Sequence, residues 1–260
     1  MSFLQTLYTE FLKLKRTRIP WVLTLVYCLA PLMMSLMMAV LKNPELGRRL
    51  GLVAAKAQLT VGVADWPTYL QLTGFLIAGG FIVIAIVQAF VFGREYAEGT
   101  AKNLLCLPIR RAELVAAKLV VSAVWFLGMA ALMYAEALAL GHLLGLPGFS
   151  AALLAASLRQ AVLLAAQVLL LGTVPAWIAV AARGYLAPLG FSILLFLVGD
   201  LFAHTGWGPW VPWSILLLSA GAGGAEAPVP GIGSYLVLVG VSAAGFAAAW
   251  LHLDRVDNTQ

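Results

Sequence analysis

The sequence LQLTGFLIAGGFIVIAIVQAFVF occupies positions 70–92 and contains no charged residue. A helix needs about 20 mainly apolar residues to cross the roughly 30 Å hydrocarbon layer, because each residue rises about 1.5 Å. This segment is therefore long enough to span a membrane. The rest of the chain has the same character, since 62% of its 260 residues are hydrophobic and only 10% are charged. We predict an all-α integral membrane protein.

Five more segments meet the same length criterion and predict six transmembrane helices in a single membrane domain, residues 1–260. The expected spans are residues 19–41, 70–92, 119–140, 161–182, 185–203 and 232–251. Another apolar segment, residues 207–218, is about half a span long and contains two prolines. We expect that segment to be interfacial or re-entrant. The outer loop at 42–69 is expected to contain a short surface helix.

Lys and Arg are distributed unequally between alternate loops. Eleven of the 16 fall on the side that carries both termini, four fall on the opposite side, and Arg159 lies within a span. The positive-inside rule places the basic side in the cytoplasm. We therefore predict a multi-pass protein of the cell membrane with both termini cytoplasmic. A nucleic-acid partner is disfavoured, because no basic cluster alternates with stacking aromatic residues.

Residues 1–18 are predicted to form a cytoplasmic amphipathic helix. Phe3, Leu7 and Phe11 recur at four-residue spacing, and Lys13 and Lys15 follow near the end. Such a helix lies in the membrane interface, where lipid headgroups attract its basic end. A second role, as a docking surface for a cytoplasmic protein, is compatible with the first.

The segment between the second and third spans, residues 94–118, is short and polar. A turn at 98–100 is followed by about two helical turns at 101–107, and Pro108 ends them. Two interpretations remain open. The segment is either an ordinary loop whose Lys and Arg set the topology, or an element that a partner grips to tilt both neighbouring spans.

Two motifs resemble type-2 ATP-binding-cassette (ABC) transporter permeases, and one of them also resembles a bacterial branch that includes bacitracin-resistance and lantibiotic-immunity permeases. The sequence EFLKLKRTR, residues 10–18, resembles the start of that branch. The other motif resembles the family's segment between spans two and three. Its matching positions are Arg94, Glu95, Glu98, Gly99, Thr100, Leu104, Leu105, Pro108, Arg111 and Lys118.

The resemblance implies that residues 100–107 form a coupling helix, which seats in a groove of a separate cytoplasmic ABC ATPase. The N-terminal helix would border the same contact. A working transporter would contain two ATPases and a second permease subunit, identical or different. The implied coupling residues are Glu98, Gly99, Thr100, Asn103, Leu104, Leu105, Leu107, Pro108 and Arg111.

Motifs for chemistry are missing from the sequence. It contains no G-x-x-x-x-G-K-[ST] phosphate loop, no G-x-S-x-G elbow and no H-E-x-x-H helix. We expect no catalytic residue, no metal site and no cofactor on this chain. ATP and Mg are expected on the partner ATPase.

Four ionisable residues fall within or near the spans, where a charge costs at least about 2.5 kcal/mol. Glu136 and Arg159 are equally far from the turn at 147–148, so they either form an ion pair or face water separately. Asp200 and His204, one turn apart, either form interfacial hydrogen bonds or serve as a proton or substrate site. Two uncharged residues, Gln88 and Gln167, either line a pathway or bond neighbouring helices.

We expect the transmembrane subunit of an ATP-driven exporter for an amphipathic peptide, an antibiotic or a lipid-like compound. One alternative is an ion-coupled secondary transporter that uses Glu136, Asp200 or His204. The other is a non-transporting membrane scaffold or sensor.

Overall fold

The computed structural model of the chain describes residues 3–43, 45, 63–100 and 110–255. Every regular element in these ranges is a helix, which confirms the all-α prediction. The helices are α1 (Phe3–Arg16), α2 (Ile19–Lys42), α5 (Trp66–Ala97), α7 (Arg111–Leu143), α8 (Ala151–Leu171), α9 (Thr173–Ala181), α10 (Leu186–Ala203), η1 (Gly208–Trp210), α11 (Pro212–Ala220), η2 (Gly224–Glu226) and α12 (Ile232–Arg255).

Six segments among the described residues are long and apolar enough to cross a membrane, as predicted. Five are the single helices α2, α5, α7, α10 and α12, and the other comprises α8 and α9. The break between α8 and α9 lies at Gly172. Pro175 follows three residues later and has no N–H to bond Leu171, so the helical ladder is interrupted there.

Two central helices are longer than the expected spans. α5 has 32 residues and α7 has 33, which corresponds to roughly 48 Å each. Even at the average tilt of about 20°, such helices exceed the roughly 30 Å hydrocarbon layer. α8 also begins ten residues before the expected start at 161. The connections before α5, between α5 and α7, and between α7 and α8 are therefore shorter than predicted.

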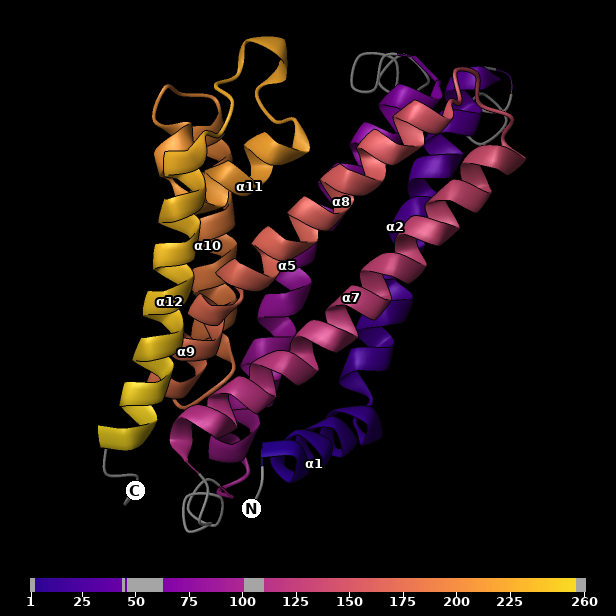
Figure 1. Cartoon of the computed structure of the whole chain (residues 1–260). Helices are drawn as coiled ribbons and strands as arrows, with labels where there is room; N and C mark the ends of the chain where they lie inside the picture. Colours follow the sequence, from indigo (N-terminus) through magenta and orange to yellow (C-terminus); the bar gives the residue numbers. More distant parts are fainter. Residues whose placement is uncertain (1–2, 44, 46–62, 101–109, 256–260) are drawn as a thin grey trace.

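Both termini lie at one end of the bundle, here called the terminal end (Figure 1). α1 crosses this end and packs against α7. α5 has a central position, because it contacts α2, α7, α8, α9, α10 and α11. Its buried residues accordingly occur all along the helix.

The half-span segment at 207–218 forms η1 and most of α11. Residues 214–218 are buried consecutively, because α11 packs against α10, α8 and α5. The segment is therefore enclosed by other helices of the bundle. α11 ends at Ala220, and its C-cap residue Gly221 has a φ of 101°, which reverses the chain. The expected outer-surface helix falls mostly at 46–62, outside the described residues.

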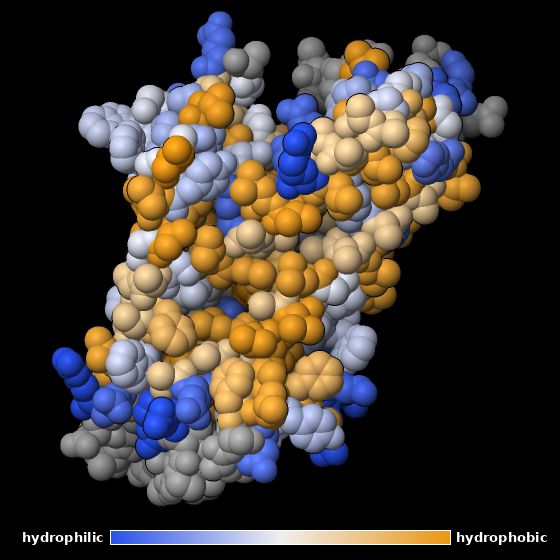
Figure 2. Space-filling model, viewed as in Figure 1, coloured by the Kyte–Doolittle hydropathy of each residue, from blue (hydrophilic) through white to orange (hydrophobic). Residues whose placement is uncertain are grey.

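The outer surface has the pattern expected in a bilayer. Figure 2 shows hydrophobic residues across the middle of the molecule and hydrophilic residues at both ends. Leu25, Leu197 and Leu236, from three different spans, are each more than 60% exposed. Trp207 and Trp210 at the other end are also exposed, as in an aromatic belt.

Candidate functional site

The N-terminal helix α1 turns its polar side toward the bundle. Thr6, Glu10 and Leu14 recur at four-residue spacing and are buried. Leu4 and Tyr8 lie on another face and are 72% and 65% exposed. The predicted amphipathic helix is therefore present, and its apolar side faces outward. This orientation suits a helix in the membrane interface whose polar side is bound by protein groups.

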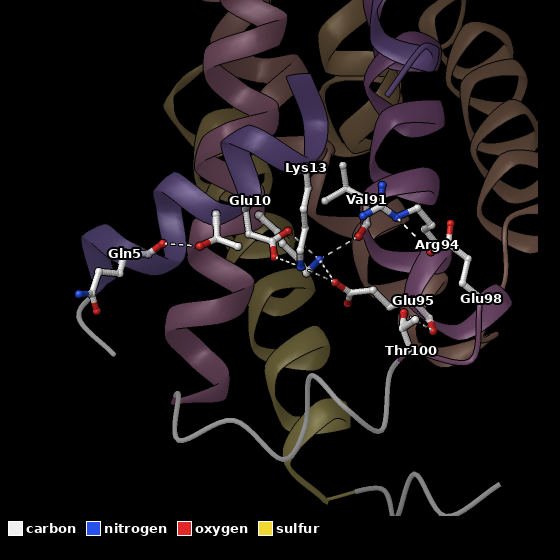
Figure 3. A network of polar contacts seen from close by, with 10 residues as sticks. Gln5, Glu10, Lys13, Val91, Arg94, Glu95, Glu98 and Thr100 are labelled. Carbon is white, nitrogen blue, oxygen red and sulfur yellow. Dashed lines mark hydrogen bonds and ion pairs between the residues drawn. The ribbon is translucent and has the colours of Figure 1, made fainter. Parts of the chain in front are cut away.

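A buried ion-pair cluster joins α1 to α5 and α7 at the terminal end (Figure 3). The side chain of Lys118, on α7, is only 3% exposed. Its Nζ lies 3.0 Å from Glu10 Oε2 and 2.8 Å from Glu95 Oε1. It also donates to the Val91 carbonyl oxygen at 3.0 Å. The three donors of the ammonium group thus have three acceptors, one on α1 and two on α5.

Lys13 supplies the second cation of the cluster. Its Nζ pairs with Glu10 Oε1 and lies 3.3 Å from Glu95 Oε1. The Glu10 and Glu95 side chains are 5% and 10% exposed. Because a buried charge is tolerated only when it is paired and hydrogen-bonded, two ammonium groups balance two carboxylates here. We call Glu10, Lys13, Glu95 and Lys118 the ion-pair cluster.

The electrostatics of the ion-pair cluster favour its charged form. Burial by itself would raise the pKa of Glu10, but the charges and hydrogen bonds of Lys118 and Lys13 lower it below 4.5. Burial would likewise lower the pKa of Lys13, but Glu10 and Glu95 raise it above 10.5. Both groups are therefore ionised throughout the neutral range.

We expect the stabilisation contributed by Glu10 to be independent of pH near neutrality. A folded pKa below the unfolded value gives stability that is present above about pH 4.5 and lost as the pH falls through the folded pKa. The raised pKa of Lys13 gives stability that is present below about pH 10.5 and lost as the pH rises through the folded pKa. The measurement is the difference in unfolding free energy between wild type and Glu10→Gln. That difference should be flat from about pH 6 to 9 and shrink in acid; a change between pH 6 and 8 contradicts the assignment.

The expected coupling segment, residues 94–118, overlaps the end of α5 and the start of α7 and contributes Glu95 and Lys118 to the ion-pair cluster. α5 ends at Ala97, and Glu98 is its C-cap residue, with Arg94 Nε 3.8 Å from Glu98 Oε2. Gly99 has a φ of 68°, which turns the chain away from α5. The Thr100 hydroxyl donates to the carbonyl oxygen of Glu95 at 3.4 Å. The start of the segment is thus bonded to a residue of the cluster (Figure 3).

The middle of that segment lies outside the described residues. These positions include Asn103, Leu104, Leu105, Leu107 and Pro108. The coupling helix therefore stays a prediction. The chain is described again from Arg110, and Arg111 begins α7.

Sequence reasoning did not bring the ion-pair cluster together. Glu95 and Lys118 fall in the polar segment predicted at 94–118, and Glu10 falls in the N-terminal helix predicted at 1–18. One signal was present, since Glu10 is the only acidic residue among the first 44. A second was Lys118, a single charge at the start of a long apolar run. Neither signal identifies the partner, because helix rotation is not encoded locally.

Glu136 and Arg159 are not joined by an ion pair in the structure, which describes both residues. Arg159 is exposed, whereas Glu136 is half-buried and close enough to Cys28 of α2 to interact with its thiol. α7 packs extensively against α2 but barely against α8. α7 and α8 are instead bridged by the hydroxyls of Tyr134 and Ser157, 2.9 Å apart. Equal depth in the membrane did not make the two charged residues neighbours.

The other polar residues are dispersed. Asp200 and His204 are both exposed, and no hydrogen bond between their side chains occurs in this described part of the chain. Gln88 is buried and accepts from the Ser122 hydroxyl at 3.4 Å. Gln167 is also buried and donates to Ser219 Oγ at 2.9 Å. The two glutamines therefore connect neighbouring helices.

These features define a polytopic membrane subunit with six spans and an N-terminal helix bound beside the loop between spans two and three. Residues 6–199 match the ABC-2 family transporter protein family. This match includes every residue of the ion-pair cluster and about three quarters of the sequence. The chain therefore belongs to the ABC-2 transporter family and is a transmembrane subunit of an ABC transporter.

One known relative indicates which branch of the family the chain resembles. The bacitracin transport permease protein BCRB of Bacillus licheniformis is 25% identical over 178 residues, which cover 68% of this chain and 85% of that protein. The chain thus resembles the bacitracin-resistance permeases, as the motif at residues 10–18 indicated. α11 and α12 lie beyond the family match, which ends at residue 199.

Proposed function

We propose that this chain is the translocation subunit of an ATP-driven exporter and is moved by a separate cytoplasmic ABC ATPase. The observation that carries the proposal is the ion-pair cluster. It joins the N-terminal helix to the ends of the two helices that flank the coupling segment. A force applied to the segment at 101–109 would therefore act on three helices together.

The proposed cycle follows from this connection. ATP binding would close two partner ATPases, which bind ATP and Mg, and thereby displace the coupling segments of two permease subunits. α1, α5 and α7 would move as one body, because separating them exposes or unpairs buried charges. The cavity between the subunits would then switch from inward or lateral access to outward access.

An amphipathic peptide, an antibiotic or a lipid-like compound is the proposed cargo. The spans are rich in Leu, Ala, Val, Met and Phe and contain few charges. The name of the B. licheniformis relative, a bacitracin transport permease, supports the same class. The excess of Lys and Arg at the terminal end supports a cytoplasmic location for that end.

Charged substitutions at Leu104 and Leu105 are expected to abolish ATP-driven transport and release the ATPase. In the proposed interface these leucines are buried, and burying two unpaired carboxylates would cost several kcal/mol. The measurement combines co-purification of the ATPase with transport of a fluorescent amphipathic peptide into inside-out vesicles. Val229→Asp is the control, because Val229 is 87% exposed in the loop at the opposite end.

The same vesicles separate this proposal from an ion-coupled carrier. An ATPase-inactive partner should stop transport, whereas an ionophore should leave ATP-driven transport intact. Transport that survives ATPase inactivation and collapses with the ion gradient would contradict the proposal. Retained complex and transport in the Leu104→Asp/Leu105→Asp variant would exclude the coupling role of the segment.

A further inference from the structure

We propose that the groove between α1 and α7 binds an acyl chain of an anionic phospholipid, whose phosphate contacts Lys15. This proposal requires that the chain is inserted in a bilayer, and it does not depend on ATP-driven transport. The phospholipid would belong to the leaflet at the terminal end. It would occupy the side of α1 that faces away from the ion-pair cluster.

The groove has the shape and the lining that a flexible apolar chain requires. Leu4, Tyr8 and Phe11 of α1 form one wall, and Val120 and Val124 of α7 contribute to the other. Its volume is about 240 Å³. An extended hydrocarbon chain can lie along an open apolar groove of this kind.

The walls of this groove are apolar groups at a membrane surface. Tyr8 is 65% exposed and Val124 is 56% exposed, although both lie on helices whose other sides are buried. Covering them with hydrocarbon removes apolar surface from water at roughly 25 cal/mol per Å². A lipid chain supplies that cover in a bilayer.

The charge of the groove selects the kind of lipid. Lys15 continues the row of Leu4, Tyr8 and Phe11, because spacings of four, three and four residues return to the same helix face. Lys15, Arg16 and Arg18 are exposed, and none of the three forms an ion pair within the ranges that the structure describes. A phosphate placed at the end of the row would meet this positive charge.

The turn after Lys15 is fixed by an interfacial aromatic residue. Trp21 is 59% exposed, and its Nε1 donates to the Lys15 carbonyl oxygen at 3.1 Å. Trp residues favour the headgroup level of a bilayer. This bond therefore holds the end of α1, with Lys15, at the depth where lipid phosphates lie. α1 would be bound on one side by the ion-pair cluster and on the other by lipid.

The test uses the full-length protein, purified in detergent without any partner and titrated with two lipids that carry the same acyl chains. Native mass spectrometry would measure binding of dioleoylphosphatidylglycerol, which is anionic, and dioleoylphosphatidylcholine, which is zwitterionic. We expect a single molecule of phosphatidylglycerol to bind each protein, and to bind more tightly than phosphatidylcholine does. Lys15→Gln should weaken phosphatidylglycerol binding about fivefold and leave phosphatidylcholine binding unchanged. Val124→Phe, which fills the groove, should weaken both.

Two matched variants serve as controls. Arg255→Gln removes another exposed cation at the terminal end, and Val162→Phe enlarges an exposed valine on α8. Neither substitution should change the affinity for the phosphatidylglycerol molecule that binds in the groove. Circular dichroism and gel filtration would verify folding. If Val124→Phe does not fold, the test rests on Lys15→Gln, which must lose the preference for phosphatidylglycerol over phosphatidylcholine for the proposal to stand.

Two results would overturn the proposal. The first is equal binding of both lipids that Lys15→Gln leaves unaltered. The second is unchanged lipid binding in folded Val124→Phe. If a protein also co-purifies from membranes with the wild type but not with Val124→Phe, the second result would make the groove a protein-docking surface. Failure of ATP-driven transport alone would leave the lipid measurements intact.

Discussion

Replacing Lys118 with methionine is expected to destabilise the protein by about 3–5 kcal/mol and to release α1 from α5 and α7. The substitution keeps an unbranched apolar stem but removes the ammonium group that lies within 3.0 Å of both Glu10 and Glu95. Two buried carboxylates then share only Lys13. Because one ammonium group cannot neutralise two buried carboxylates, the helix that carries Glu10 should leave the bundle.

Two measurements would detect the loss of stability and the release of α1. Chemical unfolding in mixed micelles gives the free energy, and maleimide labelling of Leu14→Cys reports the position of α1. Leu14 is 6% exposed, so its cysteine variant should label slowly in the docked helix and rapidly after release. The labelling background would have serine in place of Cys28 and Cys106.

Two control variants distinguish the loss of a buried charge from the loss of any charge. Arg110→Gln removes a cation whose side chain is 88% exposed, with Glu113 at 3.9 Å, and should change stability by less than about 0.5 kcal/mol. Lys118→Met combined with Glu10→Gln leaves Lys13 and Glu95 as a balanced pair. That double variant should be more stable than Lys118→Met alone. A Lys118→Met variant as stable as Arg110→Gln would show that the cluster is not coupled to folding.

Gly93→Val is expected to cost about 1–3 kcal/mol by separating α5 from the turn before α10. A Cβ at position 93 would lie 2.9 Å from the carbonyl oxygen of Gly184 and 3.1 Å from its carbonyl carbon. These are backbone atoms and cannot rotate away, so the turn itself must shift. Since Gly93 directly precedes Arg94 and Glu95, we also expect weaker binding of α1.

Gly79→Val provides a matched control in the same helix. A Cβ at position 79 would meet no atom within 4 Å, and valine is slightly better than glycine in a helix. Its unfolding free energy should therefore stay within about 0.5 kcal/mol of wild type. Equal losses in Gly93→Val and Gly79→Val, measured by the same unfolding assay, would contradict the close-approach argument.

The substitutions at Lys118 and Gly93 both test how a displacement at the terminal end passes through the bundle. The ion-pair cluster connects α1, α5 and α7, and the close approach at Gly93 connects α5 to the turn between α9 and α10. Through these contacts a displacement of the coupling segment would reach both sides of the bundle. A variant that keeps ATPase binding but loses transport would identify which connection transmits the movement.

Features that depend on local composition were predictable. A run such as 70–92 can satisfy its backbone in hydrocarbon only as a helix, so six apolar runs implied six spans. The half-span at 207–218 was also recognised by its length and prolines, but its enclosure by α10, α8 and α5 was not. The break at Gly172 was not predicted, although its cause, Pro175, is local.

Features that depend on helix rotation and on partners distant in sequence were not predictable. Glu10 and Lys118 are 108 positions apart and meet at 3.0 Å, whereas Glu136 and Arg159, placed at equal depth by the hairpin, do not pair. Depth follows from counting residues, but contact also requires that two helices turn the right faces toward each other.

The sequence by itself determined that this protein is a six-span helical membrane subunit with an amphipathic N-terminal helix. Its two motifs also indicated a resemblance to ABC-2 permeases. Only the tertiary structure decided that the polar side of α1 faces inward and that four charges from three helices balance one another. The physical reason is that hydrophobic length is a property of each segment, whereas the neutralisation of a buried charge requires partners that only the packed bundle brings together.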